Sequence, residues 1–178
     1  MLIELSALQA FREVVTIVGV IAGLTYYVLT VQNANKARKI QLTLRMAGQW
    51  QDREVSLLSL ELLEMRWEDY EDFRRKYDST VNHDNYSKRT SLFNIFSEIG
   101  YLLKQNLVDI DTVYDITGGY SPLLMWNKFR PIILKQREIY VDPTRNQWFE
   151  YLVTELSRER VKRGLAPDIT DADGYYTK

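Results

Sequence analysis

The feature that most constrains this chain is an uninterrupted apolar run over residues 14–31, VVTIVGVIAGLTYYVLTV. The run contains eighteen residues and no charged side chain. As an α-helix it would be roughly 27 Å long, which is close to the thickness of the hydrocarbon core of a bilayer. Because no other stretch of the sequence is comparably long and apolar, we expect residues 14–31 to form a transmembrane helix.

Three other kinds of segment share part of this pattern. A secretory signal peptide starts with basic residues and ends at a small-x-small cleavage site, whereas this chain opens with MLIELS and continues after the run with Gln32 and Asn33. A buried core helix usually carries a polar face, and a helix lying in the membrane interface carries a strongly charged one. The run has neither face, because its only polar side chains are three threonines and two tyrosines. A transmembrane span is therefore the favoured interpretation.

Charges on either side of the run predict its orientation in the membrane. Lys36, Arg38 and Lys39 follow the run, whereas Arg12 on the other side is accompanied by acidic residues. An excess of lysine and arginine marks the cytoplasmic end of a membrane span. We therefore expect a single-pass protein of the cell membrane, with residues 1–13 outside the cytoplasm and the C-terminal domain inside it.

The rest of the sequence predicts an all-α fold. Only four prolines and eight glycines occur in 178 residues, which argues against a loop-rich or all-β domain. Apolar residues recur every three or four positions after the span, so we expect the helix to continue through a basic juxtamembrane stalk at residues 32–52. A compact cytosolic bundle of about four helices should then occupy residues 53–164, followed by a flexible polar tail at 165–178.

Local signals predict where the helices of the bundle begin and end. Asp52 is placed to cap the first of them, although a single unbroken helix from residue 6 to 76 fits the same pattern. In chain order, the predicted helices cover residues 53–76, 89–106, a short stretch from Asp109 to the glycines at 118–119, 121–140 with a kink or interruption at Pro131, and 143–163, with a polar linker at 77–88.

Gly19 and Gly23 form a G-x-x-x-G motif inside the span. Two glycines one turn apart leave a flat strip on a helix, and this strip lets a second membrane helix approach closely. Glycine is frequent in membrane helices generally, so the motif is also compatible with a helix that stays alone. The motif predicts self-association, and the expected partners are the lipid bilayer and a second copy of the chain or another protein.

No catalytic, cofactor or metal site is recognisable in the sequence. The absence of cysteine excludes thiolate catalysis and zinc–thiolate sites, and the only histidine, His83, lies in the polar linker. The common phosphate-binding and hydrolase signatures are also missing. The net charge of −1 gives no global field that would attract nucleic acid, so no nucleic-acid partner is expected. The sequence thus favours a role without catalysis and without a cofactor.

Glu98 is the one carboxylate that the pattern places on or beside a buried helix face, close to Phe96 and Ile99. A buried carboxylate requires a compensating charge. Arg130 and Arg137 on a later predicted helix are the expected partners. Because structural ion pairs of this kind are common, we expect a structural role, with a small active site around Glu98 as the alternative.

Three motifs resemble those of small prokaryotic single-pass membrane proteins of unknown function. They are the basic junction leading into Gln41-Leu42-Thr43-Leu44 and Gln49-Trp50, the helix pattern Phe93-x-x-x-x-Glu98-Ile99-Gly100-x-Leu102, and the segment Trp126-x-Lys128-x-x-Pro131. The resemblance covers most of residues 10–140 and implies a layout but no activity. A more distant resemblance is to small CRISPR-associated membrane proteins, which pair one N-terminal span with a helical cytosolic domain and assemble into pores.

The function predicted from these observations is binding and assembly. The chain would be a membrane-tethered helical module that associates with itself or recruits a partner. A pore-forming or membrane-perturbing effector of a defence type is the second hypothesis, and a small helical hydrolase or nuclease is the third.

Overall fold

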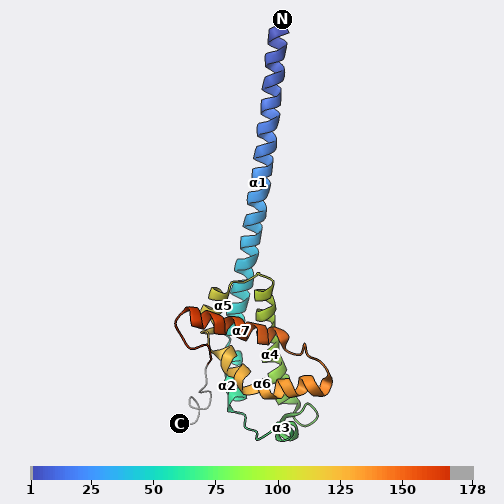
Figure 1. Cartoon of the computed structure of the whole chain (residues 1–178), viewed down its shortest axis with the longest axis vertical. Coiled ribbons are helices and arrows are strands. Elements are labelled where there is room, and N and C mark those ends of the chain that lie inside the picture. The colour runs from blue at the N-terminus through green and yellow to red at the C-terminus, as the bar shows by residue number, and fades with distance from the viewer. Residues whose placement is uncertain (1, 169–178) are drawn as a thin grey trace. The chain divides into compact units, whose positions relative to one another are not determined.

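A computed structural model describes residues 2–168 of the chain, with side chains from residue 11 onward, so that residues 169–178 of the predicted tail lie outside the described part. The described residues form seven α-helices and no strand (Figure 1), which confirms the all-α class. The helices are α1 (Leu2–Trp50), α2 (Arg53–Glu64), α3 (Tyr70–Tyr77), α4 (His83–Lys104), α5 (Ile110–Thr117), α6 (Ser121–Tyr140) and α7 (Gln147–Lys162).

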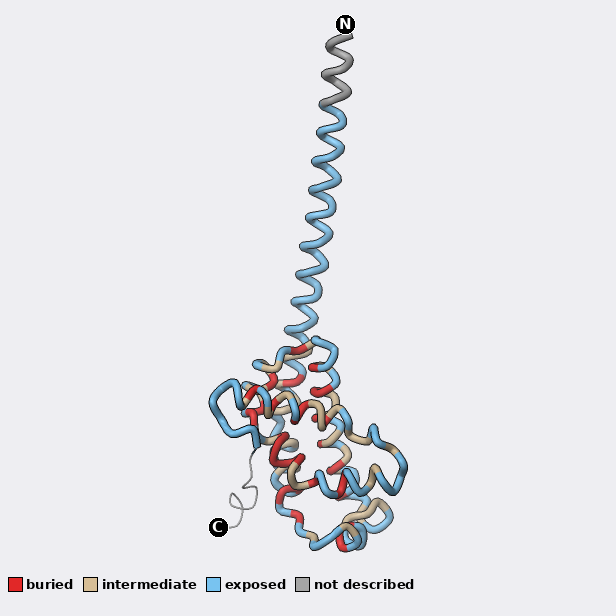
Figure 2. The backbone as a smooth tube through the Cα atoms, in the orientation of Figure 1, coloured by how far each residue is buried: buried red, intermediate tan, exposed pale blue. Residues whose placement is uncertain are grey.

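The chain divides into two compact units, residues 1–41 and 42–178. The first unit consists of α1 up to its boundary with the second, and all of its described side chains are exposed (Figure 2). The second unit contains the last turns of α1 and all of α2–α7, which enclose an apolar core. As predicted, the apolar helix continues without a break beyond residue 31, and it ends at Trp50.

The predicted helix over residues 53–76 is two helices in the structure. Asp52 caps α2 as expected, because its Oδ1 accepts a hydrogen bond of 2.8 Å from the backbone N–H of Glu54. The helix then stops at Glu64, since Met65 adopts extended backbone geometry with its side chain buried. Asp69 starts α3 by accepting a hydrogen bond of 2.8 Å from the N–H of Asp72. The alternative of one helix from residue 6 to 76 is therefore wrong.

Two further boundaries differ from the prediction. The polar linker at 77–88 is too long, because Asn82 caps α4 through a hydrogen bond of 3.0 Å from the N–H of Asn85. The last helix begins at Gln147 and not at 143, because the side chain of Asp142 accepts hydrogen bonds from the backbone N–H and hydroxyl of Thr144 and thereby forms a turn. Pro131 lies inside α6 and does not end it.

The core of the second unit is built on aromatic rings from α4, α6 and α7. Phe149 of α7 is fully buried and stacks on Phe96 of α4 with 4.7 Å between ring centroids. It also meets Phe93 at 5.5 Å and the edge of Trp126 at 5.1 Å. Phe93 in turn contacts Phe129 of α6 at 5.3 Å, so the rings form one connected cluster. Such pairs contribute about 0.5–1.5 kcal/mol each beyond the burial of their surface.

The helices α4 and α7 approach most closely at Gly100. A Cβ atom at this position would lie 1.9 Å from the carbonyl oxygen of Trp148 and 3.2 Å from the Cβ of Leu152. Only glycine at position 100 leaves room for the backbone of α7 at Trp148. Gly100 thus sets the distance between the two helices that carry Phe96 and Phe149.

We expect Gly100→Ala to lower the free energy of unfolding by about 2–3 kcal/mol, because the methyl group would displace the backbone of α7. Gly48→Ala is the matched control, because Gly48 is also helical and a Cβ there meets no atom within 4 Å. The control should stabilise the protein by about 0.5–1 kcal/mol. Chemical denaturation of the detergent-solubilised chain measures both values, and equal stability of the two variants would contradict the close approach.

Candidate functional site

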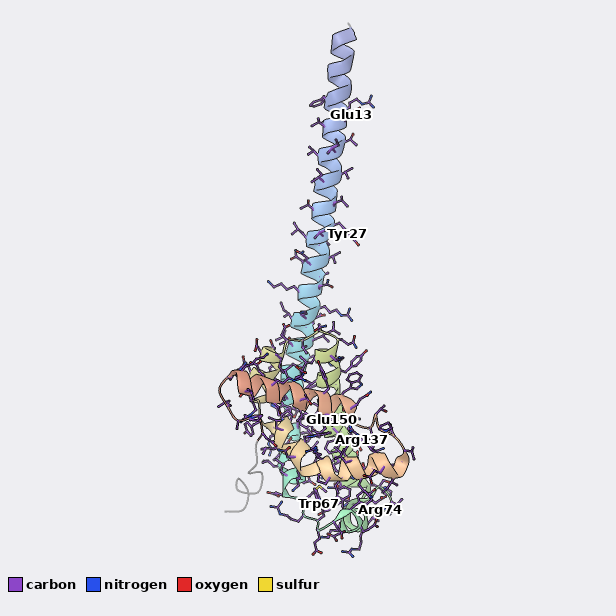
Figure 3. The ribbon with its side chains drawn as sticks, in the orientation of Figure 1. Glu13, Tyr27, Trp67, Arg74, Arg137 and Glu150 are labelled. Carbon is purple, nitrogen blue, oxygen red and sulfur yellow. The ribbon has the colours of Figure 1, made fainter. Side chains whose placement is uncertain are left out.

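The first candidate site is the apolar part of α1, whose described side chains from residue 11 to 31 are all exposed. Within α1, an 18-residue window reaches a mean hydropathy of 2.1, and none of that window is buried against the rest of the chain. By length and composition, α1 is the one helix among the described residues that can cross a membrane. Figure 3 shows its side chains, among them the labelled Glu13 and Tyr27, projecting from an uncovered helix.

The threonine hydroxyls of this segment are hydrogen-bonded to the backbone of their own helix. The hydroxyls of Thr16, Thr25 and Thr30 each donate a hydrogen bond of 2.8 Å to the backbone carbonyl four residues earlier. A hydroxyl without a partner in hydrocarbon would be costly, and this back-bonding supplies the partner from within the helix. The three threonines therefore leave no unsatisfied hydroxyl in the apolar run at 14–31, whose other polar side chains are Tyr26 and Tyr27.

Gly19 and Gly23 lie in the middle of this segment. A Cβ atom added to either residue would meet nothing within 4 Å, so the surface above both glycines is open. The two residues are one helical turn apart and share a face of α1. This geometry offers the flat strip on which a second membrane helix packs.

The basic residues Lys36, Arg38 and Lys39 follow on the same helix and are exposed. At roughly 100° per residue, Arg38 and Lys39 point about 200° and 300° away from Lys36 around the axis. The three charges thus share one half of the helix surface, with Lys36 and Lys39 about 60° apart. Such a group of cations suits the headgroup region at one end of a span.

Glu98 is paired with Arg45 and not with the expected Arg130 or Arg137. Its Oε1 lies 3.1 Å from Nη2 of Arg45, and the two side chains are 39% and 62% exposed. Arg130 is exposed on α6. The sequence pattern placed Glu98 beside the buried face correctly, but the last turns of α1 provide its partner.

The cavity beside Glu98 is too small to hold a substrate. It measures about 10 Å³, and most of its lining is apolar or aliphatic, from Leu42, Met46, Ile99 and Leu102. A cavity of this size accommodates about one water molecule. The ion pair with Arg45 therefore closes the seam between α1 and α4 and does not form the floor of a cleft.

Arg137 has a different position, at the junction of α6 and α7. Its Nη1 lies 2.8 Å from Oε2 of Glu150, and its Nε donates a hydrogen bond of 2.9 Å to the carbonyl of Arg145 (Figure 3). The side chain is only 15% exposed. Arg137 thus fastens the connection between the two helices, from which residues 142–146 emerge as turns.

A further ion-pair cluster fastens α5 to α7. Buried Glu159 accepts a hydrogen bond of 2.9 Å from Nε of Arg163, whose Nη1 lies 3.0 Å from Asp115. Hydrogen bonds from Arg163 and then Lys162 lower the pKa of the Glu159 carboxyl. The i,i+4 spacing of Glu159 and Arg163 was visible in the sequence, but their joint contact with α5 was not.

Sequence reasoning also missed Arg89, which is 6% exposed on α4. It lies three and seven residues before Leu92 and Phe96, so it falls on the same buried helix face. An arginine in that position was a signal that could have been found, because charged residues are rarely buried without a reason.

Residues 14–156 match the family described as Domain of unknown function (DUF4760). The chain belongs to this family. The DUF4760 match begins with the apolar run and ends inside α7, so it includes Gly19, Gly23, Glu98 and Arg137 but stops before Glu159 and Arg163. No curated protein and no solved structure matches the chain.

We expect Glu98→Gln to change the free energy of unfolding by at most about 1 kcal/mol, because exposed ion pairs contribute little. Arg137→Met should cost about 2 kcal/mol, because it removes two charge-assisted hydrogen bonds from a mostly buried position. Urea denaturation compares the variants. A larger loss for Glu98→Gln than for Arg137→Met would show that the two roles have been assigned the wrong way round.

Proposed function

We propose that this DUF4760 protein is a membrane-tethered helical interaction and assembly module. In this proposal α1 crosses the cell membrane once, with its N-terminal end outside, and residues 53–164 act in the cytoplasm. The observation that carries the proposal is the uncovered apolar surface of α1 between residues 11 and 31.

The size of that surface supports a bilayer as its environment. Eleven valine, isoleucine, leucine and phenylalanine side chains between Phe11 and Val31 are exposed. Removing each from water is worth about 1.5–3 kcal/mol, which sums to roughly 15–30 kcal/mol. This sum exceeds the net stability of a typical domain, about 5–15 kcal/mol. A chain that left this surface in water would therefore aggregate, whereas a bilayer covers all of its faces at once.

A tether has a direct effect on binding. Confining the cytosolic helices to the membrane plane raises their effective concentration for one another and for any partner on the same surface. Self-association through the open strip at Gly19 and Gly23 fits this role, because neither glycine is covered within the chain. Assembly in the membrane would then bring the helical domains of several copies together.

Orientation is tested with single cysteines, since the natural chain contains none. We expect a membrane-impermeant maleimide to label Ser6→Cys on intact bacterial host cells, and Gln105→Cys, at an exposed position after α4, only after permeabilisation. Labelling in detergent controls for the reactivity of each cysteine. The opposite pattern would reverse the orientation, and recovery of the unlabelled chain in the soluble fraction would overturn the membrane anchor.

Self-association is tested in vesicles with a reporter cysteine at Ala37, which lies five helical turns after Gly19 on the same face of α1. We expect disulfide cross-linking of the parent, and an at least tenfold weaker association in Gly19→Ile and Gly23→Ile, which corresponds to about 1.4 kcal/mol of lost helix packing. Thr25→Ile is the matched control on another face of α1 and should cross-link like the parent. Unchanged cross-linking in both glycine variants would show that the strip is not the contact.

The same vesicles distinguish a tether from a pore. A membrane-tethered module should leave an entrapped dye inside at every protein density. Dye release that rises steeply with protein density would support a pore-forming effector and overturn the tether.

A further inference from the structure

The strongest unassigned feature is a cationic cavity between α4, α6 and the turns that precede α7. Its volume is about 210 Å³, and its walls include Tyr86, Arg89 and Phe93 of α4, Gln136 of α6, and Arg145. No aspartate or glutamate lines it. The cavity thus brings two guanidinium groups together with no carboxylate among its described walls, although Asp78 and Asp142 lie close enough to interact electrostatically with Arg89 and Arg145.

Arg89 is the buried half of this pair. Its Nη2 donates a hydrogen bond of 2.9 Å to the carbonyl of Tyr77, and its guanidinium lies 4.6 Å from the ring centroid of Phe73. Its Nε has no hydrogen-bond acceptor among the described residues. Burial lowers the pKa of Arg89 to about 10; Tyr86 and the carboxylate of Asp78 oppose this shift, and the charge of Arg145 adds to it. A buried guanidinium with a donor left over is costly unless an anion compensates it.

Arg145 is the more accessible half; its side chain contacts neutral groups and also interacts with the charge of Asp142. Its Nε donates a hydrogen bond of 3.1 Å to Oε1 of Gln136, and its guanidinium lies 5.3 Å from the ring of Tyr140. Its backbone carbonyl accepts the hydrogen bond from Arg137 described above. The fold therefore fixes Arg145 beside the same cavity as Arg89, although the two like charges repel each other.

We propose that this cavity binds a phosphoryl group carried by a small molecule. Guanidinium groups match the geometry of phosphate oxygens, and two of them balance a doubly charged anion, whereas a carboxylate is satisfied by one. Asn94, Thr90 and Asn146 at the walls add neutral polar groups for further oxygens. The volume lies below the roughly 300–1,000 Å³ of sites for drug-sized ligands, which suits a phosphate or a small phosphorylated headgroup.

The phosphoryl group can come from a free phosphorylated solute or from a lipid headgroup, and both present the same oxygens to Arg89 and Arg145. The inference is independent of self-association through α1. A protein that failed to self-associate would still carry the cavity.

Binding is tested by isothermal titration of the full chain in maltoside micelles, a detergent without phosphate. Inorganic phosphate is titrated at constant ionic strength against sodium chloride, and micelles doped with phosphatidic acid, whose phosphate monoester can carry two negative charges, provide the lipid arm. Saturable binding of inorganic phosphate supports a free solute. Saturation only in the doped micelles supports a headgroup. No saturation in either arm overturns the proposal.

Three variants localise the binding. Arg145→Gln should weaken it at least tenfold. Asn94→Asp, at an exposed wall position, supplies a carboxylate from the chain and should abolish phosphate binding while raising the midpoint of thermal unfolding. Arg130→Gln makes the same charge change as Arg145→Gln at an exposed position of α6 outside the cavity and should bind like the parent. Equal losses in Arg145→Gln and Arg130→Gln, or unchanged binding in Asn94→Asp, would show that the anion binds elsewhere.

Discussion

The bundle depends on the contact between the backbones of α4 and α7 at Gly100. Because nothing but a hydrogen atom stands between Gly100 and the carbonyl of Trp148, the two helices are close enough for Phe96 and Phe149 to stack. Phe149 then reaches Trp126 on α6, and Phe93 reaches Phe129, so the position of the third helix follows from the distance between the first two. The ion pairs of Arg137 with Glu150 and of Arg163 with Asp115 lie near the two ends of α7. They hold the ends of this helix in addition to the aromatic cluster.

The two units of the chain solve opposite solvation problems. In the bundle, apolar side chains face inward and buried charges such as Glu159 have partners from neighbouring residues. In residues 14–31 of α1, no side chain is buried, and the backbone and threonine hydroxyls are satisfied within the helix itself. The first arrangement suits water and the second suits hydrocarbon, which is the division that the proposed membrane-tethered module requires.

The parts of the structure that follow from local chemistry were predictable. The apolar run of α1, the cap at Asp52 and the short helix after Asp109 each depend on residues that are neighbours in sequence. The break after Glu64 was not predictable in this way, because Met65 and Trp67 leave the helix to enter a core made by distant segments. The partner of Glu98 was missed for the same reason, since periodicity says which face is buried but not which helix covers it. The cavity at Arg89 and Arg145 joins residues 56 positions apart, and no local pattern records that distance.

The back-bonded threonines would affect how α1 rotates in a bilayer. Because Thr16 and Thr25 turn their hydroxyls onto their own backbone, the part of the run before Tyr26 would offer hydrocarbon no polar side. Such a helix would have no preferred rotation about its axis. A neighbour packed on the flat strip at Gly19 and Gly23 would then fix the rotation of α1 as well as contact it.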